Sequence, residues 1–459
     1  MMKLAPYPEY KEAGVGWLGS IPTHWPEKRA KYYFKEIDER SQSGEEEMLS
    51  VSHITGVTPR SEKNVTMFKA ESNVGQKLCQ PGDLVINTMW AWMSALGVSN
   101  HDGIVSPAYG VYRPRNKQNY DNYFLDHLLR IEGYRSEYIC RSTGIRSSRL
   151  RLYPDKFLSM PVVCPPQEEQ QAITRFLKAQ DHLFRKFIRN KRRLIELLKE
   201  QKQNIINQAV TRGLDPDVKL KSSGVEWIGD IPEHWEVRRL KFLCNNLNEQ
   251  TSEKQPGETY IALEHVESWT GRISLPDDEI TFDSQVKRFQ PGDVLFGKLR
   301  PYLAKVTRPQ TAGVCVGEFL VLRATGDVTA DFLEQKLRSK RVIDLINSST
   351  FGAKMPRADW TFIGNLKFAY PSADEQLEIL EHIQEKSAEI DQAISRAQRE
   401  IELMREYRTR LISDVVTGQV DVRGIEVPEM AEEELLVLDD DTGESDDVID
   451  DEGGMDEND

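Results

Sequence analysis

Four short segments combine basic and aromatic residues in loop-like sequence. They are NTMWAWMS (87–94), STGIRSSRLRLY (142–153), GKLRPYLAK (297–305) and STFGAKMPRADW (349–360). Lysine and arginine neutralise DNA phosphates, and arginine, asparagine and lysine hydrogen-bond to base edges in the major groove. The candidate DNA-binding residues are Asn87, Trp90, Arg146, Arg149, Arg151, Lys298, Arg300, Lys354 and Arg357.

Each of these segments is weak evidence alone. Surface arginines are common, and a tryptophan such as Trp90 is more often a core residue than a base-stacking one. Arg151 and Arg357 match across an internal repeat described below, so they could equally contact phosphates or serve a shared structural role. The segments gain weight because the basic loops recur at corresponding places of that repeat.

Catalytic signatures are absent from the sequence. There is no GxxxxGK[ST] phosphate loop, no GxGxxG after a strand, and no HxH or HExxH among the eight histidines. His24 and His234 each stand beside a tryptophan, which favours a packed structural role. The five cysteines are scattered without a CxxC pair, so we expect free thiols, no zinc site and a cytoplasmic location. No apolar run approaches the roughly 18 residues of a membrane span.

The chain contains an internal repeat of about 200 residues. GVGWLGSIPTHW (14–25) returns as GVEWIGDIPEHW (224–235), and QPGDLVI (80–86) returns as QPGDVLF (290–296). Further along, Pro165 matches Pro371, and Glu169-Gln170 matches Glu375-Gln376. Repeats of this size are whole domains rather than solenoid units.

Each repeat begins as a mixed α+β domain. Short apolar runs alternate with turn signals, and the Pro-Gly-Asp turns at 81–83 and 291–293 open a strand. Helices are expected over 123–131 and 331–346 between these strands. The fold class is therefore α+β, with two similar globular domains.

Each repeat ends in a long amphipathic helix. The segments 167–211 and 372–417 have no interior proline or glycine after their first residues, and apolar residues recur at spacings of 3 and 4. Because a lone amphipathic helix must bury its stripe, the two helices should pair within the chain as an antiparallel coiled coil. The alternatives are that each helix packs on its own domain or pairs with a helix of another chain. The predicted seam residues are Leu177, Phe184, Ile188, Ile195, Leu198, Ile205, Ile390, Ile394, Ile401, Met404 and Leu411.

This pattern divides the chain into six segments. They are a first head (1–166), a first long helix (167–211), a linker (212–222), a second head (223–371), a second long helix (372–417) and a C-terminal tail (418–459). The net charge of −14 comes largely from the tail, which has 16 acidic residues and no basic ones from Glu429 onward. Like charge and few aromatics predict disorder there. A solubilising role and an acidic mimic of a ligand both fit this composition.

Four features carry a resemblance over residues 13–423: the repeated GxxWxGxIPxHW segment, the Pro-Gly-Asp turn, GKLRPYL, and the Pro-x-x-x-Glu-Gln helix start at Pro165 and Pro371. The chain resembles the specificity subunits of type I restriction–modification systems. That resemblance implies two target-recognition domains, each reading one half of an asymmetric split DNA site, with the helices as spacer. It implies assembly with two modification subunits, which use S-adenosylmethionine, and two restriction subunits, which use ATP and Mg. It implies no cofactor and no catalysis in this chain.

Two other functions compete with this one. A coiled-coil scaffold with two protein-binding heads fits the nearly neutral body, since removing the tail leaves 60 basic against 58 acidic residues and DNA binders are often plainly basic. A single-chain enzyme is disfavoured because catalytic motifs are missing.

Overall fold

The computed structural model describes residues 5–62, 73–116, 118–144, 150–275, 285–352 and 354–427. The chain forms two compact units, of which the first combines residues 1–190 with 400–459 and the second contains residues 191–399. Each unit therefore holds one head and half of each long helix. This division differs from the six linear segments expected from the sequence, because the long helices are shared between the units.

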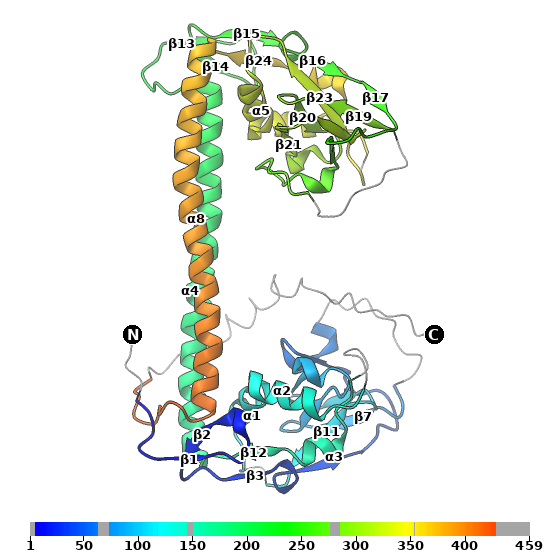
Figure 1. Cartoon of the computed structure of the whole chain (residues 1–459), viewed down its shortest axis with the longest axis vertical. Helices are drawn as coiled ribbons and strands as arrows, with labels where there is room; N and C mark the ends of the chain where they lie inside the picture. Colours follow the sequence, from blue (N-terminus) through cyan, green and yellow to red (C-terminus); the bar gives the residue numbers. More distant parts are fainter. Residues whose placement is uncertain are drawn as a thin grey trace. The chain divides into compact units, whose positions relative to one another are not determined.

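The head of the first unit, drawn in blue to cyan in Figure 1, is built on a four-stranded antiparallel sheet. The strand order is β4-β11-β8-β9. Its strands are β4 (Phe34–Ile37), β11 (Gly110–Pro114), β8 (Leu84–Ile86) and β9 (Leu96–Val98). Smaller pairings surround it: β1 (Tyr10–Glu12) with β2 (Ser20–Pro22), β3 (Glu27–Arg29) with β12 (Pro161–Val163), β5 (Leu49–Ser52) with β6 (Gly56–Pro59), and β7 (Lys77–Cys79) with β10 (Gly103–Val105). The helices are α1 (Asn122–Arg130), α2 (Glu132–Arg141) and α3 (Pro154–Leu158).

The head of the second unit repeats this plan. Its main sheet has the order β16-β23-β20-β21, from β16 (Cys244–Leu247), β23 (Phe319–Ala324), β20 (Val294–Gly297) and β21 (Val306–Thr307). A second sheet has the order β17-β19-β22-β18, from β17 (Gln250–Thr251), β19 (Val286–Phe289), β22 (Gly313–Val316) and β18 (Thr259–Ile261). The remaining pairs are β13 (Leu220–Ser222) with β14 (Asp230–Pro232) and β15 (Glu236–Arg239) with β24 (Lys367–Tyr370). The helices are α5 (Ala330–Arg338), α6 (Lys340–Ser348) and α7 (Trp360–Ile363).

The main sheet of each head has a core on both faces because its strands alternate side chains between them. In the first head, Leu84 and Ile86 pack into the cluster that holds helices α1 and α2, whereas Val85 faces a second cluster. In the second head, Val294 and Phe296 face the helices, and Leu295 faces the other side. The α+β prediction is confirmed.

The expected single helix over 331–346 is wrong in one detail. The structure has two helices, α5 and α6, separated at Ser339, whose backbone is extended (φ −63°, ψ 141°). Ser339 is buried and its hydroxyl donates to the carbonyl of Lys336. A serine side chain that satisfies a terminal carbonyl in this way allows the chain to turn between the two helices.

The two long helices are α4 (Gln167–Arg212) and α8 (Ala373–Val416). In the first unit, Arg408 of α8 donates to Asp181 of α4 at 2.8 Å, and the rings of Phe184 and Tyr407 meet edge-on. In the second unit, Lys202 of α4 pairs with Asp391 of α8. Residue numbers rise along one helix as they fall along the other, so the pair is antiparallel, as predicted.

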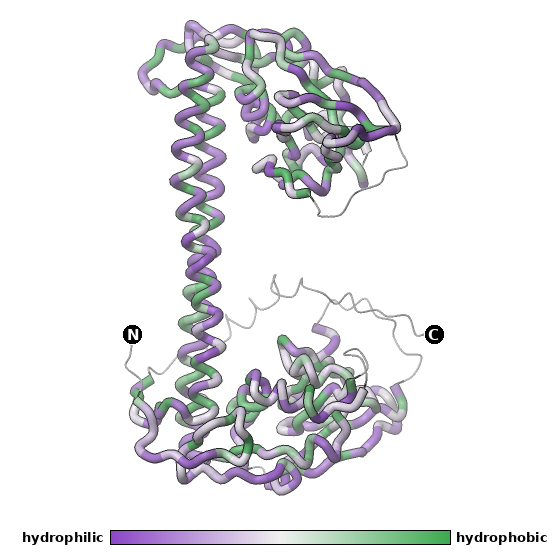
Figure 2. Tube along the Cα trace, viewed as in Figure 1, coloured by the Kyte–Doolittle hydropathy of each residue, from purple (hydrophilic) through white to green (hydrophobic). Residues whose placement is uncertain are grey.

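Burial along α8 follows the predicted seam. Ile390, Ile401 and Leu411 are buried, and Ile394 and Met404 are partly buried, whereas most residues between them are exposed. On α4, Leu177 and Phe184 are buried, and Ile188, Ile195, Leu198 and Ile205 are partly buried. Figure 2 shows the apolar residues of the two helices alternating with hydrophilic stretches along their length. The 3-and-4 spacing therefore marks the contact surface.

The ends of the helices also enter the cores of the heads. Ile173, Phe176 and Val415 belong to the core of the first head. Ile206, Val210 and Ile379 belong to that of the second. Packing against the heads, weighed as an alternative, thus occurs together with helix pairing.

The first residues of the predicted disordered tail are ordered, which corrects that expectation for residues 418–427. Asp421 pairs with Ala5 through a backbone bridge, and Val422 is buried in the core of the first head. Gly418 allows this path, because its φ of +75° and the approach of Pro22 leave no room for a Cβ. The acidic residues from Glu429 onward lie outside the described residues.

Candidate nucleic-acid interface

The Pro-x-x-x-Glu-Gln motif joins each long helix to its head through a carboxylate clasp. In the first head, Glu169 accepts hydrogen bonds from the indole of Trp25 (2.9 Å) and pairs with His24 (2.6 Å). In the second head, Glu375 accepts from Trp235 (3.0 Å) and pairs with His234 (2.7 Å). The two histidines therefore have the structural role that the sequence favoured.

The neighbouring glutamine completes the junction in both heads. Gln170 accepts from the backbone N–H of Asp121 and donates to the carbonyls of Asn119 and Pro165, all at 2.8 Å. Gln376 makes the same three bonds, to Thr329, Asp327 and Pro371. The sequence signal for these contacts was the repeat of the motif itself, which we interpreted only as a helix start.

The Pro-Gly-Asp turn is fixed by an arginine in each head. Arg113 donates two bonds of 2.9 Å to Asp83, and Arg323 donates bonds of 2.7 and 2.8 Å to Asp293. The carboxylate bonds raise the pKa of both guanidinium groups. Because both aspartates are buried, these bidentate pairs hold the start of strands β8 and β20 rigidly.

The two candidate segments of the second head, 297–305 and 349–360, meet at the end of β20. The N–H of Arg300 donates to the carbonyl of Pro356 (2.8 Å), and the N–H of Ala358 donates to that of Lys298 (3.0 Å). A backbone bridge joins Leu299 to Arg357. The segments 297–305 and 349–360, far apart in sequence, thus form one surface. The structure brings together Lys298, Arg300, Lys354 and Arg357, the four residues proposed for this head.

Three of these four residues are exposed and Lys298 is half-buried. Arg357 donates to Glu318 at 3.0 Å across an exposed ion pair, which water weakens and an incoming phosphate can replace. Lys298 lies near Lys287, whose ammonium donates to the carbonyl of Phe319. Burial lowers the pKa of Lys287, and the charge of Lys298 lowers it further. The end of β20 is therefore a local concentration of positive charge.

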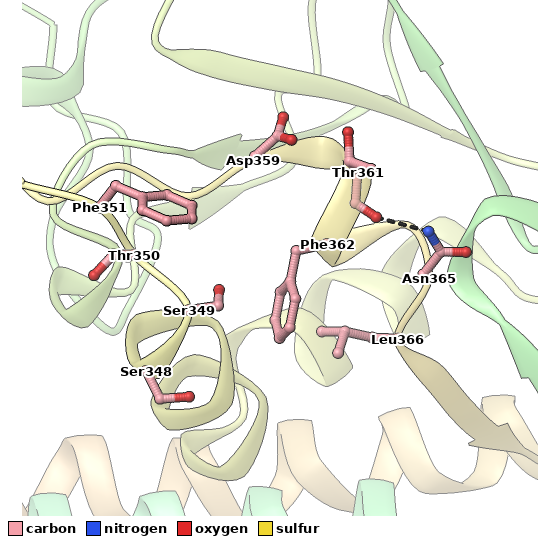
Figure 3. Close-up of a pocket in the computed structure, with 9 residues that line it drawn as sticks. All are labelled: Ser348, Ser349, Thr350, Phe351, Asp359, Thr361, Phe362, Asn365 and Leu366. Carbon is pink, nitrogen blue, oxygen red and sulfur yellow. Dashed lines mark hydrogen bonds between the residues drawn. The ribbon is translucent and has the colours of Figure 1, made fainter.

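An open hollow lies beside this loop (Figure 3). Phe351, which is 79% exposed, Phe362 and the hydroxyl residues of 348–350 line it, together with Asp359. Asn365 donates to the carbonyl of Thr361 at its rim. An exposed ring among hydroxyls can stack on a base or contact a sugar.

The first head presents the same backbone frame with other side chains. The N–H of Leu152 donates to the carbonyl of Thr88 (2.9 Å), which matches the bond from Ala358 to Lys298. Thr143 and Arg151 pair as Phe351 and Arg357 do. Ser94 and Ala304 occupy matching positions and both have left-handed backbone, with φ of 62° and 48°. By the same offset, Trp90 stands where Arg300 stands in the second head.

The candidate residues of the first head are placed unequally. Arg151 is exposed and Trp90 is half-buried. Asn87 is only 6% exposed, and its amide donates to the hydroxyl of Tyr109 at 3.2 Å. This amide is used inside the domain and is not presented at the surface. Arg146 and Arg149 lie outside the described residues.

Among the described residues, no group of histidine, cysteine, aspartate or glutamate side chains could hold a metal ion. Within the same part of the chain, no helix is long and apolar enough to cross a membrane.

Fold and site define a duplicated recognition protein, in which two equivalent heads present different side chains from one backbone frame. No protein-family model matches the chain. It is 24% identical over 177 residues to the specificity subunit of the type I restriction enzyme EcoDI of Escherichia coli, covering 38% of this chain and 39% of that one. It is 22% identical over 340 residues to the MjaVIII specificity subunit of Methanocaldococcus jannaschii, covering 70% and 76%.

Two solved structures share the fold. One is a chain from a structure describing complex assembly and conformational transition of the type I R-M system, with a TM-score of 0.58, 14% identity, and coverage of 87% of this chain and 99% of that one. The other is the HsdS subunit of Thermoanaerobacter tengcongensis, with a TM-score of 0.50, 16% identity, and coverage of 88% and 98%. The chain is therefore similar in sequence to specificity subunits of type I restriction enzymes and shares the fold of HsdS subunits.

Proposed function

We propose that this chain is the DNA sequence-specificity subunit of a type I restriction–modification complex, and that each head reads one half of a bipartite, asymmetric DNA site. The observation that carries this proposal is the repeated frame at the ends of β8 and β20. Matching backbone bonds hold the frame in both heads, and it presents Trp90 in one and Arg300 in the other, although the backbone of Arg300 is left-handed (φ 50°) and that of Trp90 is not (φ −122°). Two heads that must read different bases on the same double helix need this combination.

The exposed basic residues divide into two groups under this proposal. Residues that differ between the heads, such as Arg300 and Lys354, would contact base edges, since only these contacts carry sequence information. Residues that match, namely Arg151 and Arg357, would contact phosphates and fix the position of each head on the duplex. The exposed ion pair of Arg357 with Glu318 is consistent with this role.

The long helices would set the separation of the two half-sites and dock modification subunits. Exposed leucines support a docking role: Leu183, Leu194 and Leu197 on α4, and Leu377 and Leu403 on α8, point away from the helix seam. Apolar residues outside a seam indicate a further helical or apolar partner. The complex would contain two modification subunits and two restriction subunits.

The chemistry of the complex would reside in those partners. Methyl transfer from S-adenosylmethionine and ATP- and Mg-dependent restriction would use their active sites, and this chain would supply recognition only. Accordingly, we propose no cofactor for this chain. The scaffold alternative, with two protein-binding heads, predicts no DNA binding at all.

The test is an exchange of the second head. Residues 224–371 are replaced by the corresponding head of another specificity subunit, and methylated adenines are sequenced in cells that carry the complete system. One half-site of the modified sequence should change, while the other half-site and the spacer length are kept. A change in both half-sites, or in neither, would contradict independent reading by the two heads.

A salt titration separates DNA binding from the scaffold alternative. Labelled duplex that carries the methylated sequence should be bound with and without the modification subunit. The logarithm of the affinity should fall linearly with the logarithm of the salt concentration. No binding of the duplex at any salt concentration, with or without the modification subunit, would favour the scaffold.

A further inference from the structure

Both heads expose a basic and aromatic patch at the same position, away from the candidate reading loops. In the first head the patch consists of Lys28, Arg29, Lys31 and Tyr32. In the second it consists of Arg238, Arg239, Lys241 and Phe242, each exactly one 210-residue offset later. Tyr32 and Phe242 are both 60% exposed. We call these two sets the outer patches.

The geometry of the outer patches is repeated in detail. The ammonium of Lys31 lies 5.4 Å from the ring centroid of Tyr32, and that of Lys241 lies 5.5 Å from the ring centroid of Phe242. Each aromatic residue ends a 3-10 turn, Ala30–Tyr32 in one head and Leu240–Phe242 in the other. Buried residues anchor both turns, because the N–H of Ala30 donates to the carbonyl of Met160 (2.7 Å) and that of Leu240 donates to Leu366 (2.8 Å).

The exposed ring has no evident role in folding. The change from tyrosine to phenylalanine between the heads shows that the hydroxyl is dispensable and that the shared feature is a ring beside a cation. A large exposed ring at one position could be accidental. The same ring with the same overlying lysine in both heads indicates a shared binding role.

Two things are common to both heads under the proposed function: the DNA backbone and the modification subunits. The pairing register of the strands shows how far the outer patches lie from the surface that would face the DNA, and so which of the two they can contact. Strand β4 begins just after the patch, and its Phe34 pairs with Pro114 at one end of β11. We call the turn that carries Trp90 in the first head, and Arg300 in the second, the reading turn. Ile86, just before this turn, pairs with Gly110 at the other end of β11. At about 3.3 Å per residue, β11 separates the patch from the reading turn by at least about 13 Å.

The second head has the same arrangement. Cys244, just after the patch, pairs with Ala324, whereas Gly297, at the reading turn, pairs with Phe319 at the opposite end of β23. The outer patches therefore lie at the end of the main sheet opposite to the surface that would face the bases. This position favours a protein over the DNA duplex as the occupant.

We propose that the outer patches are docking sites for the two modification subunits, one subunit on each head. This inference rests on the proposed function. A lysine over an exposed ring, with two further basic residues beside it in sequence, calls for a partner surface with carboxylates around an apolar recess, which receives the ring of Tyr32 or Phe242. Arg238 of the second patch pairs with Glu236 and Asp327, so the chemistry that both patches share is the lysine over the exposed ring. Because this feature recurs in both heads, the same partner surface would be used twice.

The experiment measures assembly of the full chain with the modification subunit of its own system. Three variants are compared with the parent: Lys31→Glu with Tyr32→Ala, Lys241→Glu with Phe242→Ala, and all four substitutions together. Native mass spectrometry counts the bound subunits, and a titration gives each affinity. The parent should bind two subunits. Each two-residue variant should bind one subunit as before and the other at least tenfold more weakly, and the fourfold variant should weaken both.

Matched controls separate the patch from general surface effects. Ile139→Ala, at an exposed apolar residue of α2 that the second head does not repeat, and Arg272→Glu, at an exposed cation, should leave both affinities unchanged. Tyr32→Phe, which copies the second head, should retain full binding because it keeps the ring. Unchanged thermal unfolding of the variants that carry Tyr32→Ala or Phe242→Ala shows that their loss of binding is not a folding defect.

The outcomes that would overturn the proposal are distinct. If the fourfold variant still binds two subunits with parental affinity, the outer patches are not part of the subunit interface. If the same variant bound DNA more weakly with a shallower salt dependence, the patches would be phosphate contacts. If the parent chain bound neither the modification subunit nor DNA, the proposed function would fail and the docking sites with it.

Discussion

Trp90 in the first head and Arg300 in the second occupy matching places on the same turn, and most of the backbone bonds that shape this turn are matched. The N–H of Arg300 donates to Pro356, however, whereas that of Trp90 donates to Asn87. Thr88 accepts from Leu152 as Lys298 accepts from Ala358. The heads thus differ in the side chains that this turn presents, and they agree in most of the bonds that hold its backbone. A duplicated fold can change what it reads without changing how its loops are supported, as long as specificity lies in side chains that no buried contact constrains.

The agreement between the heads is not complete at the carboxylate clasp. Glu169 has two partners that Glu375 lacks: the hydroxyl of Tyr7 donates to it at 3.2 Å, and Arg423 pairs with it at 3.5 Å. Both come from outside the repeated segment, Tyr7 from the start of the chain and Arg423 from the segment after α8. The first head is therefore closed by two chain segments, whereas the second head is closed by a continuous linker.

The largest effect should come from changing the helices without touching either head. Inserting one heptad in α4 between 193 and 194, and another at the matching height of α8, keeps the seam in phase and lengthens the pair by about 10 Å. If the helices set the spacer, the parental DNA site should no longer be methylated, and sites with about three more base pairs between unchanged half-sites should be. Sequencing of methylated adenines measures this, and unchanged spacing would refute the role of the helices as a ruler.

The next largest effect should distinguish the two clasps. Glu169→Ala leaves the buried donors of Trp25 and Tyr7 without an acceptor, at a cost of about 3–5 kcal/mol in local stability. Glu375→Ala leaves only the indole N–H of Trp235 without an acceptor and should cost about 1–3 kcal/mol of local stability. Hydrogen exchange over residues 14–34 and 224–244 reports each head separately.

Glu168→Ala is the matched control for this comparison, because Glu168 is exposed on the same turn of α4. It should leave exchange in both segments unchanged. Equal losses in Glu169→Ala and Glu375→Ala would show that Tyr7 and Arg423 add nothing to the first clasp.

The parts of this molecule that the sequence predicted are those with a periodic or repeated signal. The seam from Ile390 to Leu411 was predictable because its spacing is regular over many turns, and the two heads were predictable because their motifs recur. The convergence of Arg300 with Pro356 was not, since pairing between distant loops leaves no local pattern. Asn87 shows a related limit: its sequence context resembles a surface loop, but Tyr109, more than twenty residues later, covers its amide.

Ser339 and the segment 418–427 show the other kind of failure. The amphipathic pattern of 331–346 continues across Ser339, so only the tertiary structure reveals the turn between α5 and α6. The acidic composition after Glu429 led us to treat the whole tail as one segment. The alternating apolar residues Val420 and Val422, which pack against the first head, were therefore missed. Composition averaged over a segment cannot detect a short strand-like stretch at its edge.

A third difference between the heads makes one of them sensitive to pH. Lys336 of α5 is fully buried, donates to the carbonyl of Val210 and lies over the ring of Trp235. Burial lowers its pKa to about 7. By the offset of 208 that relates α1 to α5, the first head has Leu128 at this position. Because the unfolded lysine keeps its proton up to about pH 10, the second head should gain stability as pH rises from about 7 towards 10.

The substitution Lys336→Met should remove this dependence. It should stabilise the second head relative to the parent at pH 6, where the buried ammonium is charged, and this advantage should shrink by about 3 kcal/mol by pH 9, since each pKa unit corresponds to about 1.4 kcal/mol. Hydrogen exchange of α5 at the two pH values measures the change. Leu128→Met in the first head is the control, and a pH-independent difference for Lys336→Met would contradict the lowered pKa.

The smallest effect should come from Arg151 and Arg357, which test whether the two heads hold the duplex in the same way. Each is exposed, and each lies on a short backbone pairing that its side chain does not support. If both contact phosphates, Arg151→Ala and Arg357→Ala should weaken binding to every duplex alike and reduce the salt slope by about one each. Lys354→Ala should instead cost about 1–3 kcal/mol for the specific site only and relax one position of one half-site. If Arg151→Ala and Arg357→Ala relaxed single positions of opposite half-sites, matched residues would also read bases, and the side chains shared by the heads could no longer be assigned to the backbone of the DNA.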